Sequence, residues 1–365
     1  MRKLASIQRI TKITPIPNAS NIELATILGW HVAIKKGEFR PGDLVVYAEA
    51  DSILPKENPD FKHLEGKRVR TEKIGNIYSQ GMVFPTSILP AEYEIEKGIE
   101  EGADVTVELG VTKWDPDEGS HIKARHTTKI KYPDKWYTKS SIGKWLWEKF
   151  IYRPAAGPFP NWIYKANETR IQSLQDILNT YVGTPCEYTE KLNGASITVW
   201  FDHNKNKLRV CSPNHEIYDH KDPFFQAALK YEDQIWCLPK SIVLQGEIVG
   251  PDIQKNRYGL RGARIYFYQA WLKGVGYLQP SVFRDMMKRR GLSTVPYLGT
   301  IRLGTSIDYF VGLSVGMSEL NPATKREGII IRPQTNIYVP DDERFVGGRL
   351  SLKVINPDFL VEYNL

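Results

Sequence analysis

Lys191 is the residue of this sequence best placed for covalent chemistry. It opens a Lys-x-Asn-Gly pattern, Lys191 to Gly194, that follows one strand-like run and precedes another. A lysine amine is a nucleophile that can attack a nucleoside triphosphate and hold the nucleotide covalently. The pattern is short and recurs by chance, and most lysine side chains are solvated surface charges, so its meaning depends on residues further along the chain.

Three charged residues downstream of Lys191 lie in or beside apolar, strand-like runs. Glu247 is the one carboxylate of its run, and a carboxylate in a buried strand needs a partner. Glu327 stands at the mouth of another run, where Gly328 lets a second group approach the backbone, which suits a metal ion or a phosphorus centre. Lys353 interrupts a third run, where a buried lysine favours contact with a phosphate over surface exposure.

The run from Arg264 to Trp271 is rich in aromatic residues. Strand alternation places Tyr266 and Tyr268 on one face and Phe267 on the other. A ring at this point could stack on a nucleobase, although an aromatic core strand would have the same composition.

These motifs, in this order, resemble those of the covalent nucleotidyltransferase superfamily of DNA ligases, RNA ligases and mRNA capping enzymes, over about residues 160–365. The resemblance makes Lys191 the catalytic nucleophile and Glu327 the metal-linked carboxylate. It implies nucleotide contacts from Glu190, Leu192, Asn193, Gly194, Ser196, Glu247, Tyr266, Phe267 and Lys353. Among these, Glu190 and Leu192 would face the base through their backbones, Glu247 would accept from a ribose hydroxyl, and Lys353 would contact the α-phosphate.

The order of the parts narrows the resemblance. An OB-like region precedes the motifs and twelve residues follow Lys353, whereas DNA ligases and capping enzymes carry an OB domain after the closing motif. This arrangement, the Glu190-Lys191 pair and the run Arg170 to Leu174 resemble the Deinococcus-type RNA ligases, the fifth RNA-ligase family. Three positions depart from the family pattern. Asn193 stands where Asp is common, and Ser351 stands where many relatives have the first lysine of the closing motif. Pro213 stands where an arginine is expected, a loss for which Arg209 could compensate.

The implied activity is that of an ATP-dependent RNA ligase using Mg²⁺ or Mn²⁺. Lys191 would form lysyl-AMP, AMP would pass to an RNA 5′-phosphate, and a 3′-hydroxyl would displace AMP to seal the strand, with nicked duplex RNA as the expected substrate and no obligate protein partner. Since a protonated lysine cannot attack, we expect a divalent cation and Lys353 to lower the pKa of Lys191.

Two other classes of function remain open. A DNA ligase or an mRNA-capping-type guanylyltransferase is the alternative within the superfamily, and a non-catalytic RNA-binding protein is the alternative from another class. The presence of Lys191, Glu247, Glu327 and Lys353 argues against the latter, because binding alone does not need all four.

The patterning predicts an α+β protein of two domains joined by a basic segment. Residues 1–113 contain five strand-like runs, at 5–16, 23–35, 44–54, 81–89 and 104–111, which predict an OB-fold-like β-barrel. Residues 161–365 are predicted to form a nucleotidyltransferase domain with antiparallel sheets, from runs at 197–202, 207–212, 241–249, 263–272, 328–332 and 350–355. Helices are predicted at 168–178, near 223–232 and near 281–290.

Residues 114–160 are predicted to be a linker or an insertion, with one amphipathic helix over 141–152. The net charge of +7 is concentrated in this region: residues 121–170 hold eleven Lys or Arg against Asp134, Glu148 and Glu168, together with Trp136, Trp145, Trp147 and Trp162. Basic residues interleaved with aromatics suit a phosphate backbone with exposed bases. They equally suit a connector whose tryptophans pack on a neighbouring domain.

The sequence has no apolar signal segment and no stretch near the roughly 20 apolar residues of a membrane helix, so we expect a cytoplasmic protein. Cys186, Cys211 and Cys237 are far apart and contain no CxxC pair, which argues against a disulfide framework or a zinc site. They are expected to be small buried hydrophobic residues.

Overall fold

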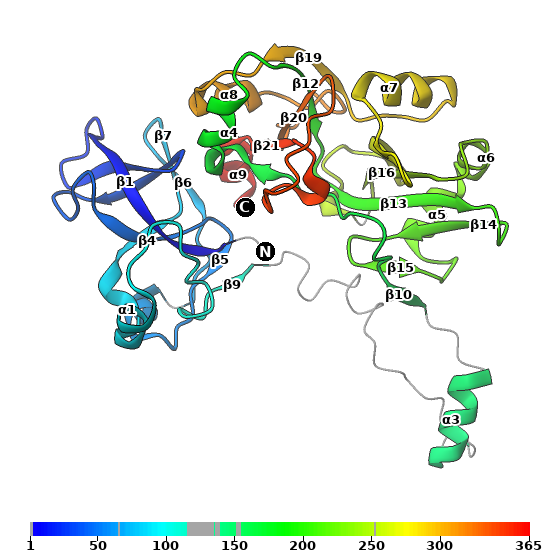
Figure 1. Cartoon of the computed structure of the whole chain (residues 1–365), viewed down its shortest axis with the longest axis horizontal. Coiled ribbons are helices and arrows are strands. Elements are labelled where there is room, and N and C mark those ends of the chain that lie inside the picture. The colour runs from blue at the N-terminus through cyan, green and yellow to red at the C-terminus, as the bar shows by residue number, and fades with distance from the viewer. Residues whose placement is uncertain (1–2, 65, 115–134, 136–138, 151–154, 252) are drawn as a thin grey trace.

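The computed structural model describes residues 3–64, 66–114, 135, 139–150, 155–251 and 253–365. It shows two domains side by side, the N-terminal one drawn in blue and cyan and the C-terminal one from green to red (Figure 1). The role of the basic segment in RNA contact stays a prediction, because several of its residues lie outside the described ones. These are Lys123, Arg125, Lys129, Lys131, Trp136 and Arg153. Among the described residues, no helix has the length and apolar character needed to cross a membrane.

The N-terminal domain is a curled antiparallel half-barrel, as the OB-fold prediction requires. Its five-stranded sheet has the order β3-β2-β1-β4-β8, built from β1 (Ala5–Pro15), β2 (Ile22–Ile27), β3 (Trp30–Lys35), β4 (Leu44–Ala48) and β8 (Met82–Pro85). A bulge between Ile10 and Lys12 interrupts β1, whose first half pairs with β4 and whose second half pairs with β2. Ile7 accordingly packs in one apolar core and Ile10 in a second.

Smaller elements complete this domain: β5 (Ser52–Ile53), η1 (Pro59–Leu64), β6 (Thr71–Ile74), β7 (Ile77–Gln80), η2 (Thr86–Ile88), α1 (Ala91–Lys97) and β9 (Thr112–Lys113). The strand predicted at 104–111 is wrong, because these residues form turns. Asp104 Oδ1 accepts from the backbone N–H of Thr106, and the N–H of Leu109 donates to the carbonyl of Val105. Val105 and Leu109 are buried, whereas Val107 between them is 87% exposed.

The helix predicted over 141–152 is present as α3 (Ser141–Phe150), apart from both domains in Figure 1. Its described side chains Ile142, Trp145 and Leu146 are exposed.

The C-terminal domain contains two sheets. The seven-stranded sheet, in the order β10-β15-β14-β13-β16-β17-β18, consists of β10 (Ala156–Pro158), β13 (Ala195–Asp202), β14 (Lys207–Cys211), β15 (His215–Ile217), β16 (Ile242–Val249), β17 (Arg264–Leu272) and β18 (Gly276–Tyr277). The five-stranded sheet, in the order β11-β21-β20-β12-β19, consists of β11 (Thr169–Arg170), β12 (Pro185–Lys191), β19 (Tyr297–Arg302), β20 (Gly328–Pro333) and β21 (Leu352–Ile355). All pairings are antiparallel except that of β11 with β21, which confirms the predicted α+β class.

Helices accompany each sheet and close its apolar core. The first core joins the seven-stranded sheet to α5 (Pro223–Leu229), α6 (Glu232–Trp236) and α7 (Pro280–Arg289). The second joins the five-stranded sheet to η4 (Ile171–Ser173), α4 (Gln175–Thr180) and α8 (Ile307–Ser314), and α9 (Pro357–Tyr363) follows β21. The helix predicted over 168–178 therefore starts late, because Thr169 and Arg170 pair with β21 as a strand.

The segment before β11 belongs to the C-terminal domain. β10 pairs with β15, so the seven-stranded sheet takes in residues 156–158, ahead of the boundary at 161 proposed from the sequence. Trp162 packs against Trp200 and Trp271, with ring centroids 5.5 and 5.9 Å away. Trp162 therefore packs on the C-terminal domain, as expected if the basic segment is a connector whose tryptophans pack on a neighbouring domain.

The two domains touch through several polar contacts. Asp51 accepts from Arg68 of its own domain and, at 3.3 Å, from Arg170 on β11. The N–H of Gly29 donates to the carbonyl of Gln172 at 2.8 Å, and a Cβ at Gly29 would lie 2.2 Å from Ile307 Cδ1. This close approach requires glycine, and the OB-fold domain therefore rests on the half of the C-terminal domain built around the five-stranded sheet.

The cysteines follow the prediction in part. Cys186 and Cys211 are buried, and burial raises the pKa of Cys186 to about 12. Cys237 is exposed instead, because it lies just after α6 at the surface.

Candidate active site

Lys191 is the last residue of β12 and lies where the chain passes from the five-stranded to the seven-stranded sheet. In the pairing of β12 with β20, Lys191 stands opposite Gly328, which brings Glu327 beside it. Lys191 Nζ lies 2.7 Å from Glu327 Oε1. The group that approaches Gly328 is the chain itself, since a Cβ there would lie 2.1 Å from the carbonyl oxygen of Val354.

The turn after Lys191 is fixed by three side chains. The N–H of Gly194 donates to Glu247 Oε1 at 3.1 Å, and the N–H of Asn193 donates to Tyr258 Oη at 2.6 Å. Arg257 Nε donates to Asn193 Oδ1 at 2.7 Å. Glu247 therefore holds the nucleophile turn in addition to the ribose contact that the family resemblance implies.

Arg257 links this turn to the C-terminal helix and so to the other domain. Its guanidinium lies 3.7 Å from the ring centroid of Tyr363 on α9. Asp358, at the start of α9, accepts from the hydroxyl of Tyr78 on β7 of the OB-fold domain. A continuous set of contacts thus runs from the OB-fold domain to the residues next to Lys191.

Lys191 opens into a cavity of about 230 Å³. The cavity is lined by Ala166, Asn167, Glu168, Thr189, Glu190, Lys191, Leu192, Ser196, Glu247, Tyr268, Val295, Ile330, Arg332 and Lys353. The structure therefore brings together six of the residues predicted from the sequence, namely Glu190, Lys191, Leu192, Ser196, Glu247 and Lys353. Gly194 is bonded to Glu247 and Glu327 to Lys191, whereas the partners of Asn193 are Tyr258 and Arg257.

The two predicted aromatic residues are also absent from the cavity lining. Phe267 is fully buried in the core of the seven-stranded sheet, on the face opposite the cavity, so the structure does not place it where a base could bind. Tyr266 packs in a small cluster with Leu192 and Tyr258. The ring that reaches the cavity is Tyr268, whose hydroxyl lies 3.0 Å from Ser196 Oγ.

Arg332 and Glu168 are cavity residues that the motifs did not identify. Arg332 Nη2 lies 2.8 Å from Glu168 Oε1, Nε donates to Ser351 Oγ at 3.0 Å, and Nη1 donates to the carbonyl of Tyr268 at 3.0 Å. A cation thus lies beside Ser351, the position where family members have a lysine. Arg209 does not serve the cavity, because it is ion-paired with Glu216 on β15.

The carboxylates around Lys191 favour its ammonium form. Burial alone would lower the pKa of Lys191, but Glu327 and Glu247 outweigh it and leave that pKa raised. Burial raises the pKa of Glu247 to about 8, although Lys191 acts in the opposite direction. Lys191 in this state is a cation held by Glu327.

The donor set fits a hard divalent cation that also binds phosphates. The described residues contain no cluster of three or more His, Cys, Asp or Glu arranged as a metal cage. Mg²⁺ in nucleotide enzymes is commonly held by one or two carboxylates together with substrate phosphates, and Glu327 is the carboxylate placed for this.

The raised pKa of Glu247 predicts a pH-dependent stability. Because the folded-state pKa lies above the usual value, the stabilisation from the protonated carboxyl is complete below pH 4.5 and is lost as pH rises through about 8. Glu247→Gln keeps the acceptor for Gly194 without the charge. At pH 9 we therefore expect its free energy of unfolding to exceed that of the unsubstituted protein by roughly 1–3 kcal/mol. Urea unfolding at pH 5 and pH 9 measures this, with exposed Glu57→Gln as control, and equal pH slopes for all three proteins would contradict it.

Comparison with known proteins agrees with this geometry. An OB-fold domain model matches residues 4–86, and an RNA ligase model matches residues 184–355. A Naegleria gruberi RNA ligase solved with PPi covers 100% of this chain and 99% of its own, with a TM-score of 0.78 and 27% identity. A mutant of that enzyme with ATP and Mn has a TM-score of 0.77 and 28% identity, covering 100% of this chain and 98% of its own. Another mutant, with AMP and Mn, has a TM-score of 0.77 and 28% identity, covering 98% of each chain. No curated protein matches the sequence.

The cavity between the two sheets, its paired Lys191 and Glu327, and these matches agree with one another. Residues 184–355 of this enzyme match the RNA ligase family, residues 4–86 match an OB-fold domain, and the whole chain is similar in structure to the Naegleria gruberi RNA ligase.

Proposed function

We propose that this enzyme uses ATP to join RNA 3′-hydroxyl and 5′-phosphate ends, with a nick in duplex RNA as its substrate. The observation that carries the proposal is the 2.7 Å contact of Lys191 with Glu327 at a cavity that Glu247 and Lys353 also line. The similar Naegleria gruberi structures contain ATP, which ATP-dependent ligation consumes, or AMP or PPi, which it releases, and several also contain Mn.

In the first step Lys191 Nζ forms a bond to the α-phosphorus of ATP, and the bond to the β-phosphate oxygen breaks, releasing pyrophosphate. A divalent cation, Mg²⁺ or Mn²⁺, would be held by Glu327 and would neutralise phosphate charge. With its carboxylate so engaged, Glu327 no longer favours the ammonium form of Lys191, which can then lose its proton. Lys353, on β21 in the same cavity, supplies positive charge to the phosphate undergoing transfer.

The side chain of Glu190 supports the choice of ATP over GTP. Its backbone N–H donates to the carbonyl of Pro296 at 2.9 Å, so that donor is not available to a base. Its Oε2 accepts from the N–H of Glu319, and its Oε1 is buried without a hydrogen-bond partner among the described residues. An acceptor in that position suits the amino group of adenine and disfavours the carbonyl of guanine.

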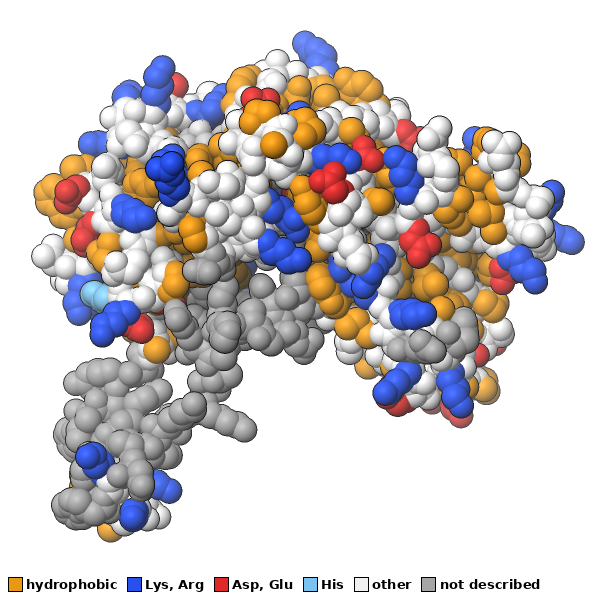
Figure 2. All heavy atoms as spheres, turned by 180° about the vertical axis from the view of Figure 1, so that it is seen from behind, with side chains coloured by type: hydrophobic (Ala, Val, Ile, Leu, Met, Phe, Trp, Pro, Cys, Tyr) orange, Lys and Arg blue, Asp and Glu red, His pale blue; other side chains and the backbone are white. Residues whose placement is uncertain are grey.

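The later steps use the same groups. The AMP passes from Lys191 to an RNA 5′-phosphate, forming a phosphoanhydride, and the 3′-hydroxyl then attacks this 5′-phosphate and releases AMP. Positive charge supports a polyanionic substrate: the net charge is +7, concentrated in residues 121–170, and Lys and Arg side chains are more prominent than acidic ones on the face in Figure 2. The narrower assignment to the Deinococcus-type RNA ligases is part of the proposal and rests on the OB-fold domain preceding the ligase domain.

Labelling with α-³²P-ATP or α-³²P-GTP and a divalent cation tests the proposal. A denaturing gel should show covalent label from ATP and none from GTP. Label from GTP would favour a guanylyltransferase, and absence of label with either nucleotide would favour a non-catalytic RNA-binding protein. Sealing of nicked DNA as fast as nicked RNA would favour a DNA ligase.

A further inference from the structure

Arg349 is a buried arginine next to the active-site cavity that the chemistry above does not use. Arg349 directly follows η6 (Val346–Gly348) in the chain and is 5% exposed. The guanidinium carbon lies 4.4 Å from the ring centroid of Tyr277. Within the described part of the chain, Arg349 makes this cation–π contact but no side-chain hydrogen bond and no ion pair.

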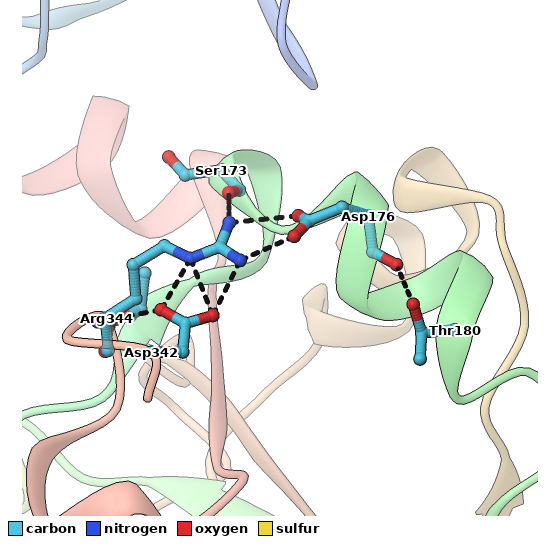
Figure 3. A network of polar contacts seen from close by, with 6 residues as sticks. Ser173, Asp176, Thr180, Asp342 and Arg344 are labelled. Atoms are coloured by element: carbon cyan, nitrogen blue, oxygen red, sulfur yellow. Dashed lines mark hydrogen bonds and ion pairs between the residues drawn. The ribbon is translucent and has the colours of Figure 1, made fainter. Parts of the chain in front are cut away.

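An arginine five residues earlier shows what a satisfied guanidinium looks like in the same region. Arg344 lies between the carboxylates of Asp176 and Asp342 and also donates to the carbonyl of Ser173 (Figure 3). Its pKa is raised by Asp176 and Asp342. Burial and the nearby Arg332, in contrast, lower the pKa of Arg349 to about 9, so it is still a cation at neutral pH.

An unpaired buried cation is costly, because its N–H donors lose water and gain no acceptor. Arg332, its neighbour, is paired with Glu168 and bonded to two further acceptors. Glu168, the carboxylate that acts on the pKa of Arg349, is therefore already engaged by Arg332, and no ion pair joins Arg349 to a carboxylate among the described residues.

The hollows around Arg349 adjoin the active-site cavity. Arg349 lines two smaller hollows. One also contains Lys165 and Ser351 and shares Ala166, Asn167 and Glu168 with the active-site cavity. The other shares Thr189, Tyr268, Val295 and Arg332 with it. A ligand in the active-site cavity can therefore extend a group toward Arg349.

The charge of this extension is positive. The two hollows together are lined by four cations, Lys165, Arg284, Arg332 and Arg349, against the carboxylates of Glu168 and Glu187, and Arg284 is ion-paired with Glu187. Lys165 Nζ bonds Asn214 Oδ1 at 3.1 Å and is exposed, which leaves its other two N–H groups able to reach an anion. A planar guanidinium with an ammonium beside it is the combination that phosphate oxygens prefer.

We propose that Arg349, with Lys165, forms a phosphate subsite beside the active-site cavity. It receives a phosphate group of a substrate, either from the pyrophosphate end of ATP or from the RNA strand. This inference rests on the proposed function for the origin of the phosphate, but the binding of a phosphate group itself does not depend on ligase activity.

Thermal unfolding of the full chain with inorganic pyrophosphate tests the subsite. Arg349→Met removes an unpaired charge, so its unfolding temperature without ligand should equal or exceed that of the unsubstituted protein, while its affinity for pyrophosphate should fall about ten-fold or more. Arg344→Met is the matched control: it breaks the network of Figure 3, so its unfolding temperature should fall while its pyrophosphate response is unchanged. Arg349→Lys keeps the charge and should lose part of the pyrophosphate response.

Two kinetic arms identify the source of the phosphate. If the subsite holds the end of ATP, Arg349→Met should raise the KM for ATP in self-adenylylation about ten-fold and leave sealing by pre-adenylylated protein unchanged. If it holds RNA, the reverse is expected. The subsite is overturned if Arg349→Met lowers the unfolding temperature as Arg344→Met does, or if neither Arg349 variant changes the pyrophosphate response. If pyrophosphate binding depends on Arg349 but the protein never becomes labelled by α-³²P-ATP, the subsite is supported and the ligase proposal is rejected.

Discussion

Lys191→Ala is expected to abolish covalent capture of AMP while sparing the last step of the reaction. The amine of Lys191 is the nucleophile of the first step and the leaving group of the second, but the third step joins two RNA ends without it. Label from α-³²P-ATP should therefore fall to background. A nick with a 5′-phosphate should stay open, and a nick that already carries AMP on its 5′-phosphate should still be sealed.

The exposed lysine Lys240 provides the control for this prediction. Lys240→Ala should label and seal like the unsubstituted protein. Persistent label in Lys191→Ala would place the nucleophile elsewhere, Lys353 being the other lysine that lines the cavity. Loss of sealing on the AMP-capped nick would show that Lys191 also acts in the third step.

Glu327→Gln is expected to slow both self-adenylylation and sealing by roughly 100-fold or more, the scale seen when one group that stabilises transition-state charge is removed. Glutamine keeps the shape of the side chain but not the charge that holds a divalent cation. The same change removes the carboxylate that most strongly raises the pKa of Lys191, so that pKa should fall. Activity should fall even though the amine is easier to deprotonate.

Two measurements separate these effects. A Mn²⁺ titration of the labelling rate should show weaker apparent metal affinity in Glu327→Gln, and an amine-reactive reagent should modify Lys191 at lower pH than in the unsubstituted protein. Exposed Glu343→Gln should change neither. Full activity of Glu327→Gln at the usual metal concentration would remove Glu327 from the metal site.

Much of the fold could be predicted because the strands alternate or are continuously apolar. The runs at 197–202 and 241–249 correspond to β13 and β16, and the run at 328–332 to β20. The run at 104–111 also alternates, yet Asp104 Oδ1 accepts from the backbone N–H of Thr106 and turns the chain. Local side-chain hydrogen bonds overrode the periodicity there, which a pattern of apolar residues does not reveal.

The site was predictable as far as its motifs reach. Lys191, Glu247 and Lys353 stand in recognisable runs, and the structure brings all three to one cavity. Their distances depend on register: Lys191 meets Glu327 because β12 pairs with β20, and no local pattern fixes a pairing between segments so far apart.

The other residues of the site come from segments without a motif. Arg257 follows Gln254 to Asn256, three consecutive residues with positive φ. These residue types do not predict such a conformation, so the position of Arg257 could not be predicted from the sequence. Glu168 was counted only as an acid within a basic segment, and Arg332 lay unassigned at the end of the Glu327 run. Strand alternation separates Tyr268 from Phe267 but not from Tyr266, so the sequence alone does not select the ring that lines the cavity.

The central claim is that AMP travels from Lys191 to an RNA 5′-phosphate before the strand is sealed, and a pulse–chase experiment tests it most directly. Protein labelled with α-³²P-ATP is freed of nucleotide and mixed with nicked duplex RNA, and protein, RNA and free AMP are separated over time. We predict that label leaves the protein, appears on the RNA 5′ end and is released as AMP together with joined product, in that order. Label that stays on the protein, or AMP released without joined RNA, would contradict the account.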